Sequence, residues 1–213
     1  MISEPFYTIN QIKYEANRHL ETKEGYQWYS VNKHGLTPFA NSKLYFKEKL
    51  IAQTISDMVK GRSVLDLGCD KGYFSWWSMK CGATSVTAND INMRLYKYLH
   101  LLFRTMRWNI EILVDDLFQQ DSSRKWDCVL ALALLHQLPF ELDASIRIIR
   151  SICSYRCIIE FCEDYQKSLG DNWNVSNFEQ IINRFFTYSD LIASYPAIGK
   201  YDGVRYIYDC RCN

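Results

Sequence analysis

The chain has 213 residues, of which 48% are hydrophobic and 23% are charged, a composition typical of one soluble globular domain with a sizeable core. Its formal net charge is only +1, so no global field attracts nucleic acid or an anionic membrane. The start, "MISEPFYTIN", lacks the basic and then apolar order of a secretory signal, and no apolar run is long enough to span a bilayer. We therefore expect a cytoplasmic protein with no membrane partner.

The eight cysteines do not indicate a metal centre. No CxxC pair occurs, and the Cys210–Cys212 spacing is unlike that of zinc ligands. Because Cys128, Cys153 and Cys157 lie within apolar runs, we expect reduced cysteines in the core and no metal.

The first 61 residues are expected to form an N-terminal helical cap. Residues 7–20 favour a helix, and residues 44–59 place apolar side chains at helical spacing before Gly61. Residues 25–42 between them are rich in aromatic, polar and turn-forming side chains. Residues 62–213 then form the main part of one compact unit.

Strand-like and helix-like segments alternate from residue 63 onward. The expected strands are 63–68, 84–90, 110–115, 126–133 and 156–161. The expected helices are 73–82, 93–106, 140–152 and about 175–186. Residues 186–196 and 203–212 can form a terminal antiparallel pair, joined by a short turn region. The pattern predicts an α/β, Rossmann-like, doubly wound and mostly parallel seven-stranded sheet with a terminal antiparallel strand.

The loop after the first of these strands, "VLDLGCDKGYFS" (64–75), suggests a ligand site. It fails as a Walker loop, because Gly72 is followed by Tyr73 instead of lysine and serine or threonine. Asp70 stands between Gly68 and Gly72, where it would repel a pyrophosphate. The loop therefore favours a cationic ligand such as S-adenosylmethionine, which carries a sulfonium and an ammonium group and no phosphate.

Acidic residues also follow the next two strands. Asp90 ends the second strand, and Asp115 and Asp116 end the third. Taken singly, Asp90 could cap the next helix, and Asp115 or Asp116 could be a turn residue. Three acids after three successive strands are more specific, because parallel strands end at one edge of the sheet.

Residues 62–162 resemble the class I S-adenosylmethionine-dependent methyltransferases. Asp66, Gly68 and Gly72 match the D-x-G-x-G-x-G pattern of their first motif, and Asp70 replaces the middle glycine. The segment "KWDCVLALALLHQLP" is similar to the fourth strand of the family and the loop after it. The resemblance implies that S-adenosylmethionine is the cofactor. It also implies that Asp90 binds both ribose hydroxyls and that Asp116, with Asp115 beside it, faces the adenine amino group.

The segment "WYSVNKHGLTPFAN" resembles a subgroup similar to the tRNA wobble-uridine carboxymethyltransferases and to glycan or small-molecule O-methyltransferases. Trp28 and Tyr29 offer aromatic faces that could close over the cofactor and exclude water. Equally, they could fasten the N-terminal segment to the domain.

The acceptor is less clearly indicated. The Asn/Asp-Pro-Pro-aromatic motif of nucleobase amino-methyltransferases is absent after the fourth strand, which favours a hydroxyl of a small molecule or glycan. A tRNA acceptor is disfavoured; it would require a continuous basic surface made by Lys43, Lys47, Lys49, Arg94, Lys97 and Arg104. A third alternative is a catalytically silent subunit that activates a partner. The sequence does not indicate the oligomeric state.

His136, in "LLHQLP", is the first candidate for the base that removes the acceptor's proton. Glu160, at the end of the fifth strand, is the second candidate. The alternative for His136 is a structural histidine that ties this loop to the backbone.

Overall fold

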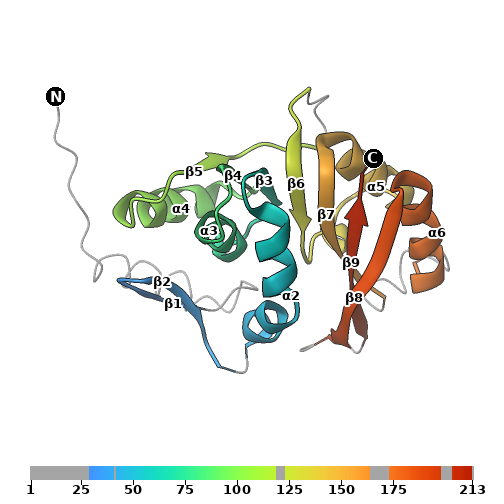
Figure 1. Ribbon diagram of the computed structural model, residues 1–213, viewed down its shortest axis with the longest axis horizontal. Coiled ribbons are helices and arrows are strands. Elements are labelled where there is room, and N and C mark those ends of the chain that lie inside the picture. Colours follow the sequence, from blue (N-terminus) through green and yellow to red (C-terminus); the bar gives the residue numbers. More distant parts are fainter. Residues whose placement is uncertain (1–28, 41, 119–122, 164–172, 198–202, 213) are drawn as a thin grey trace.

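The computed structural model describes residues 29–40, 42–118, 123–163, 173–197 and 203–212 (Figure 1). The expected helix over 7–20 and Trp28 lie outside these residues. No helix in the described ranges is both long and apolar enough to cross a membrane.

The described part of the N-terminal segment is a β-hairpin followed by one helix, whereas the sequence suggested helices alone. Strands β1 (Tyr29–Asn32) and β2 (Gly35–Pro38) pair antiparallel around a two-residue turn. Helix α2 (Lys43–Val59) begins at Ser42, whose side chain accepts a hydrogen bond from the Tyr45 N–H. Buried residues of the hairpin and α2 share one core with the sheet, so the described N-terminal segment packs as part of the same unit.

The main sheet has seven strands in the order β5-β4-β3-β6-β7-β9-β8, which confirms the expected fold class. β3 (Ser63–Leu67), β4 (Ser85–Asn89) and β5 (Ile110–Leu113) follow one another toward one edge of the sheet. β6 (Trp126–Ala131) then pairs with the other side of β3. β7 (Cys153–Cys162) continues the parallel set. β9 (Val204–Arg211) lies antiparallel between β7 and the edge strand β8 (Tyr188–Pro196). The direction of winding therefore reverses between β3 and β6, where ligands bind in such sheets.

Helices cover both faces of the sheet (Figure 1). Along β3, Val64 packs into one core with residues of α2, α3 (Tyr73–Lys80) and α4 (Met93–Thr105). Leu65 and Leu67 pack into the other core, with residues of α5 (Leu142–Ile152) and α6 (Val175–Phe185). Both faces of the central strands are thus buried, which explains their nearly uninterrupted apolar runs.

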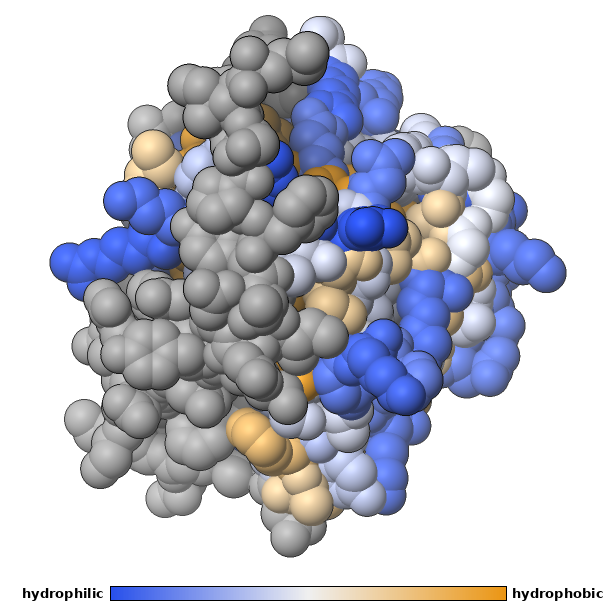
Figure 2. All heavy atoms as spheres, turned by 90° about the vertical axis from the view of Figure 1, so that its left-hand side faces the viewer, coloured by the Kyte–Doolittle hydropathy of each residue, from blue (hydrophilic) through white to orange (hydrophobic). Residues whose placement is uncertain are grey.

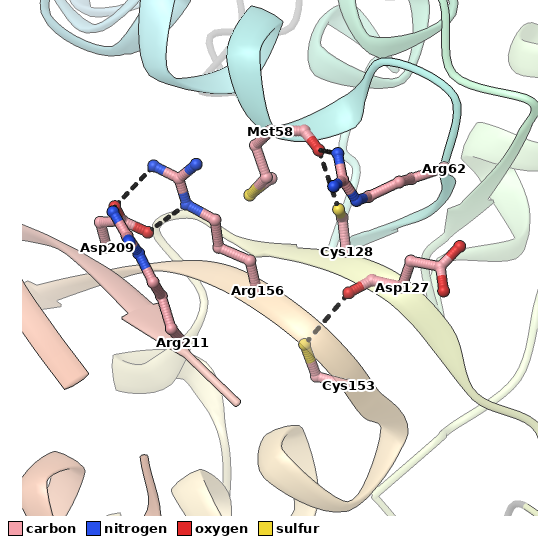
Figure 3. A network of polar contacts seen from close by, with 8 residues as sticks. All are labelled: Met58, Arg62, Asp127, Cys128, Cys153, Arg156, Asp209 and Arg211. Carbon is pink, nitrogen blue, oxygen red and sulfur yellow. Dashed lines mark hydrogen bonds and ion pairs between the residues drawn. The ribbon is translucent and has the colours of Figure 1, made fainter. Parts of the chain in front are cut away.

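A polar network lies at the amino ends of the parallel strands β6 and β7 (Figure 3). Arg156 on β7 donates two hydrogen bonds of 2.6 Å to the Asp209 carboxylate on β9. The Cys128 thiol donates to the Met58 carbonyl at 3.4 Å, which joins β6 to the end of α2. All eight cysteines are free thiols. The network occupies the edge away from the carboxyl ends of the parallel strands and leaves that second edge for a ligand.

The face on the side of α4 and the β1–β2 hairpin is coloured mainly hydrophilic, with smaller apolar areas between (Figure 2). α4 and the residues just before it leave three large side chains exposed, namely Ile91, Met93 and Tyr96. Ile91 belongs to the crevice described next.

Candidate active site

A crevice of about 450 Å³ opens at the carboxyl ends of β3, β4, β5 and β6. Five of the residues predicted for the site line it: Gly68, Asp70, Asp90, Asp115 and Asp116. Most of the remaining wall is apolar and comprises Leu67, Ile91, Leu95, Leu117, Phe118, Leu132, Ala133, Leu134, Leu138, Pro139 and Phe140, with Asn89, Asn92 and Gln137 as further polar residues.

The loop between β3 and α3 has a backbone that favours glycine. Gly68 and Gly72 have φ of 70° and 75°, and Asp70 has φ of 48°. A Cβ on Gly68 would lie 2.9 Å from Leu134 Cδ1, and one on Gly72 would lie 2.7 Å from Phe103 Cζ. The two glycines therefore let the chain turn tightly between β3, α4 and the crevice. Asp70 adopts the left-handed conformation that aspartate tolerates better than most residues.

Asp90 links this loop to the end of β4. Its Oδ2 accepts a hydrogen bond from the Asp70 N–H at 3.1 Å, and its Oδ1 accepts one from the Asn92 N–H at 2.9 Å. The N-cap of α4 is Asn92, so the helix-cap alternative for Asp90 does not hold. Asp90 instead lies in the crevice with its carboxylate oriented by two backbone amides.

The loop is strongly acidic. Asp66 is buried beneath it and accepts a 2.6 Å hydrogen bond from Ser75 Oγ. Burial raises the pKa of Asp66 to about 7, with smaller contributions from the charges of Asp90 and Asp70. Burial likewise raises the pKa of Asp90. An anion brought into this loop would make the ionised forms of Asp66 and Asp90 still less favourable, whereas a cation would stabilise them.

The far end of the crevice suits a flat, partly polar group. The Asn89 side-chain amide donates hydrogen bonds to the carbonyls of Leu113 (3.0 Å) and Asp115 (2.9 Å), which fixes the chain after β5. Asp116 Oδ1 accepts one from the Phe118 N–H at 3.0 Å. Asp116 thus acts as a turn residue as well as lining the crevice.

Apolar side chains that sequence reasoning did not single out form the walls here. The Phe118 and Phe140 rings stack with centroids 6.0 Å apart. Ile91 lies beside Asp90 on the crevice wall, with 70% of its surface exposed and therefore open to contact with a ligand. Its position directly after an acid at a strand end was the one signal in the sequence that could have identified it.

Tyr29 supports the loop from outside the crevice. It is buried, and its hydroxyl donates a 2.5 Å hydrogen bond to the Lys71 carbonyl and lies 2.6 Å from the Tyr98 hydroxyl. Tyr29 is absent from the crevice wall, as are Asp66 and Gly72. The contacts correspond to the alternative in which Tyr29 fastens the N-terminal segment to the domain.

Lys71 is a further residue that sequence reasoning missed. Its side chain is 3% exposed, and among the described residues its Nζ has no hydrogen-bond partner. Burial lowers the pKa of this amine, although the charge of Asp70 acts to raise it. A buried ammonium beside the glycine loop is costly unless an anionic group approaches it.

His136 and Glu160 lie together, behind the crevice wall. His136 belongs to the short helix η1 (Leu135–Gln137); its neighbours Leu134 and Gln137 line the crevice and it does not. Burial and then the charge of Arg205 lower the pKa of His136 to about 4. Glu160 is completely buried and forms ion pairs with Lys47 and Arg205.

The sequence matches the model of a family described as "Methyltransferase domain" over residues 43–193, which is most of the chain. No curated protein matches it. Among solved structures, the PH0226 protein from Pyrococcus horikoshii OT3 is 20% identical, with a TM-score of 0.61 over 81% of this chain and 93% of its own.

Two further structures are similar. Magnesium protoporphyrin IX methyltransferase from Synechocystis PCC 6803, with bound SAH, is 17% identical, with a TM-score of 0.58 over 85% of this chain and 91% of its own. The bifunctional kinase-methyltransferase WbdD is 16% identical, with a TM-score of 0.68 over 95% of this chain and 46% of its own. At these identities the structural matches establish the fold, and the family model establishes the family.

Proposed function

The chain belongs to the family of S-adenosylmethionine-dependent methyltransferase domains, and we propose that it methylates a hydroxyl of a small molecule or glycan. The observation that supports the cofactor best is the acidic glycine loop at the reversal between β3 and β6. In this loop the backbone at Gly68 packs closely against Leu134, and Asp70 and Asp90 provide carboxylates to the crevice.

The residues present fit S-adenosylmethionine. That cofactor supplies a methyl group activated by a positively charged sulfur. Asp70 and Asp90 provide negative charge near the loop; Lys71, in the same loop but behind the crevice wall, is the nearest cation assigned to the carboxylate of the amino-acid end. In the same assignment, the oriented Asp90 carboxylate accepts hydrogen bonds from the ribose hydroxyls. Asp116 and Asp115 face the adenine, which lies between the apolar walls.

Methyl transfer by in-line displacement requires that the protein align the acceptor oxygen with the methyl group and accept the proton of the acceptor hydroxyl. Of the two candidate bases, His136 is the better one, because its imidazole is neutral near pH 7, although a pKa of about 4 makes it a weak base. Glu160 is held by two cations; although burial acts to raise its pKa, their charges lower it to about 2. Glu160 therefore serves better to position its neighbours than to remove a proton.

The tRNA alternative is weakened by one of the six residues it needs. Lys47 is 1% exposed and paired with Glu160, so it cannot contribute to a continuous basic surface with Lys49 and the cations of α4. The silent-subunit alternative predicts an occluded crevice, whereas the crevice between β3 and β6 is open enough to expose Ile91.

Isothermal titration calorimetry with S-adenosylhomocysteine tests the cofactor assignment. We expect Asp90→Ala to weaken binding by roughly 2–3 kcal/mol, because charge-assisted hydrogen bonds to the ribose are lost. Asp57→Ala removes an exposed acid from α2 and should leave affinity unchanged. A wild-type protein that fails to bind S-adenosylhomocysteine would refute the proposed function, and an unchanged affinity in folded Asp90→Ala would remove Asp90 from the site. The acceptor is then sought by screening hydroxyl compounds for methyl transfer.

A further inference from the structure

The turn that leaves β6 has a strained backbone. Ala133 lies in the crevice wall, and its φ is 56°, in the left-handed region that alanine adopts rarely. Two other described residues that are not glycine share a positive φ, and each has an ordinary reason for it. Arg107 follows the end of α4, where helices commonly finish in this conformation, and Asp70 has a short polar side chain that tolerates it. Ala133 has neither reason, and such strain persists only where the surrounding structure holds it.

Gln137 holds this turn. Its side-chain Nε2 donates a hydrogen bond of 2.8 Å to the Ala133 carbonyl, and its backbone N–H donates one of 2.8 Å to the Leu134 carbonyl. The side chain and the backbone of one residue thus bind two consecutive carbonyls of the turn. Gln137 is exposed and lines the crevice, so its side chain makes this contact at the surface that a ligand would meet.

The turn sets the position of one crevice wall relative to the other. Leu134 follows Ala133 and packs so closely onto Gly68 that a Cβ there would lie 2.9 Å from Leu134 Cδ1. Gly68 belongs to the loop after β3 and Leu134 to the loop after β6, so their contact lies where the direction of winding reverses. Both residues line the crevice. A different backbone conformation at Ala133 would therefore move Leu134 away from Gly68 and change the shape of the crevice.

We propose that Gln137 is a positioning residue for the cofactor: it holds the strained turn at Ala133, keeps Leu134 against Gly68 and so shapes the crevice before the cofactor binds. The inference rests on the proposed function, because it takes the crevice between β3 and β6 as the cofactor site. A site that already has its bound shape binds more tightly, since none of the interaction energy is needed to order its wall. The alternative is that Gln137 only adds a hydrogen bond to a short helix.

Calorimetry with S-adenosylhomocysteine tests the inference on the wild type, Gln137→Met, Ala133→Gly and the double variant. Methionine has nearly the length of glutamine but cannot donate the hydrogen bond. We expect Gln137→Met to weaken binding about fivefold to tenfold, as for the loss of one hydrogen bond. In the Ala133→Gly background the same substitution should weaken binding less than about twofold, because glycine adopts positive φ without strain and the turn no longer depends on Gln137.

Gln53→Met is the matched control. Gln53 is likewise an exposed glutamine whose Nε2 donates a 2.8 Å hydrogen bond, in this case to Asp57 on α2, and it does not line the crevice. The control should leave the affinity for S-adenosylhomocysteine unchanged. Hydrogen exchange of the ligand-free protein, followed by mass spectrometry, should become faster over residues 132–138 in Gln137→Met and stay unchanged there in Gln53→Met.

Two calorimetric results would overturn the inference. Equal affinities of the wild type and Gln137→Met would show that cofactor binding does not depend on this hydrogen bond. An equal loss from Gln137→Met in the wild-type and Ala133→Gly backgrounds would show that Gln137 acts on the ligand directly and not through the turn. Failure of the proposed function is seen separately, as a wild type that does not bind S-adenosylhomocysteine; unchanged hydrogen exchange in ligand-free Gln137→Met would instead refute the role of Gln137 in holding the turn.

Discussion

Replacing Asp66 with asparagine should remove a large pH dependence of stability. Asp66 is buried and its pKa is about 7, against 3.8 for an aspartate exposed to water. The folded protein therefore holds this proton more tightly than the unfolded chain does, so stability falls as the pH rises through the interval between the two values. At 1.36 kcal/mol per pH unit, the full interval corresponds to about 4 kcal/mol, of which about 3 kcal/mol falls between pH 5 and pH 8.

The measurement is urea unfolding of the wild type and Asp66→Asn, followed by tryptophan fluorescence at several pH values. Asparagine keeps the shape of the side chain and an oxygen that can accept the Ser75 hydrogen bond. The difference in free energy of unfolding between the two proteins should change by about 3 kcal/mol from pH 5 to pH 8, in favour of the variant at high pH. Parallel curves would refute the reasoning, since they would mean that Asp66 ionises in the folded protein as it does in the unfolded chain. Asp57→Asn, on the exposed face of α2, is the control and should run parallel to the wild type.

Two further predictions concern the glycine loop. Gly72→Ala should lower the free energy of unfolding by about 1–3 kcal/mol more than Gly61→Ala, because both glycines have positive φ but only a Cβ at Gly72 meets neighbours, among them Phe103 at 2.7 Å; equal losses in urea unfolding would contradict the packing argument. Lys71→Met should weaken S-adenosylhomocysteine binding about tenfold and leave 5′-methylthioadenosine, which lacks the carboxylate, unaffected. Calorimetry with both ligands decides the point, because equal losses would mean that Lys71 supports the loop instead of binding the carboxylate.

The sheet could be predicted closely because its strands are short apolar runs separated by helices and turns. The predicted strands at 63–68 and 84–90 differ from β3 and β4 by a residue or two at their ends. The strand expected at 156–161 is longer, since β7 begins at Cys153, immediately after α5 ends at Ile152. Its first residues are partly exposed and lack an apolar run, so periodicity did not reveal them.

The hairpin could not be predicted from local patterns. Its turn residues are Lys33 and His34, which lack the Asn-Gly or Asp-Gly pattern of two-residue hairpins. Gly35 follows the turn, and a Cβ there would lie 2.3 Å from Trp76 Cζ2. The glycine is thus required by packing against α3, a contact between segments about forty residues apart that no local pattern encodes.

The acidic residues of the crevice could be predicted from the sequence because of the sheet topology. Parallel strands bring their carboxyl ends to one edge of the sheet, so acidic residues that follow successive strands lie close together. No such rule predicts the buried ion pairs of Glu160 with Lys47 and Arg205. Lys47 and Glu160 are 113 positions apart, and Glu160 and Arg205 are 45 apart on antiparallel neighbours. The register of β7 against β9 places Arg205 opposite Cys162, two residues from Glu160, and the packing of α2 brings Lys47 to the same carboxylate.

The surroundings of His136 bear on how the proton of the acceptor is removed. Transfer of the methyl group to a hydroxyl oxygen forms a C–O bond and breaks the C–S bond, with the electron pair of that bond left on sulfur, and the hydroxyl proton passes to a base. His136 is neutral near pH 7, but a pKa of about 4 makes it a weak base, because burial and then the charge of Arg205 disfavour the imidazolium. The Glu160 carboxylate acts in the opposite direction, although it is itself paired with Lys47 and Arg205. A weak base accepts the proton only as the C–O bond forms, when the hydroxyl proton becomes strongly acidic, so proton removal by His136 accompanies methyl transfer instead of preceding it.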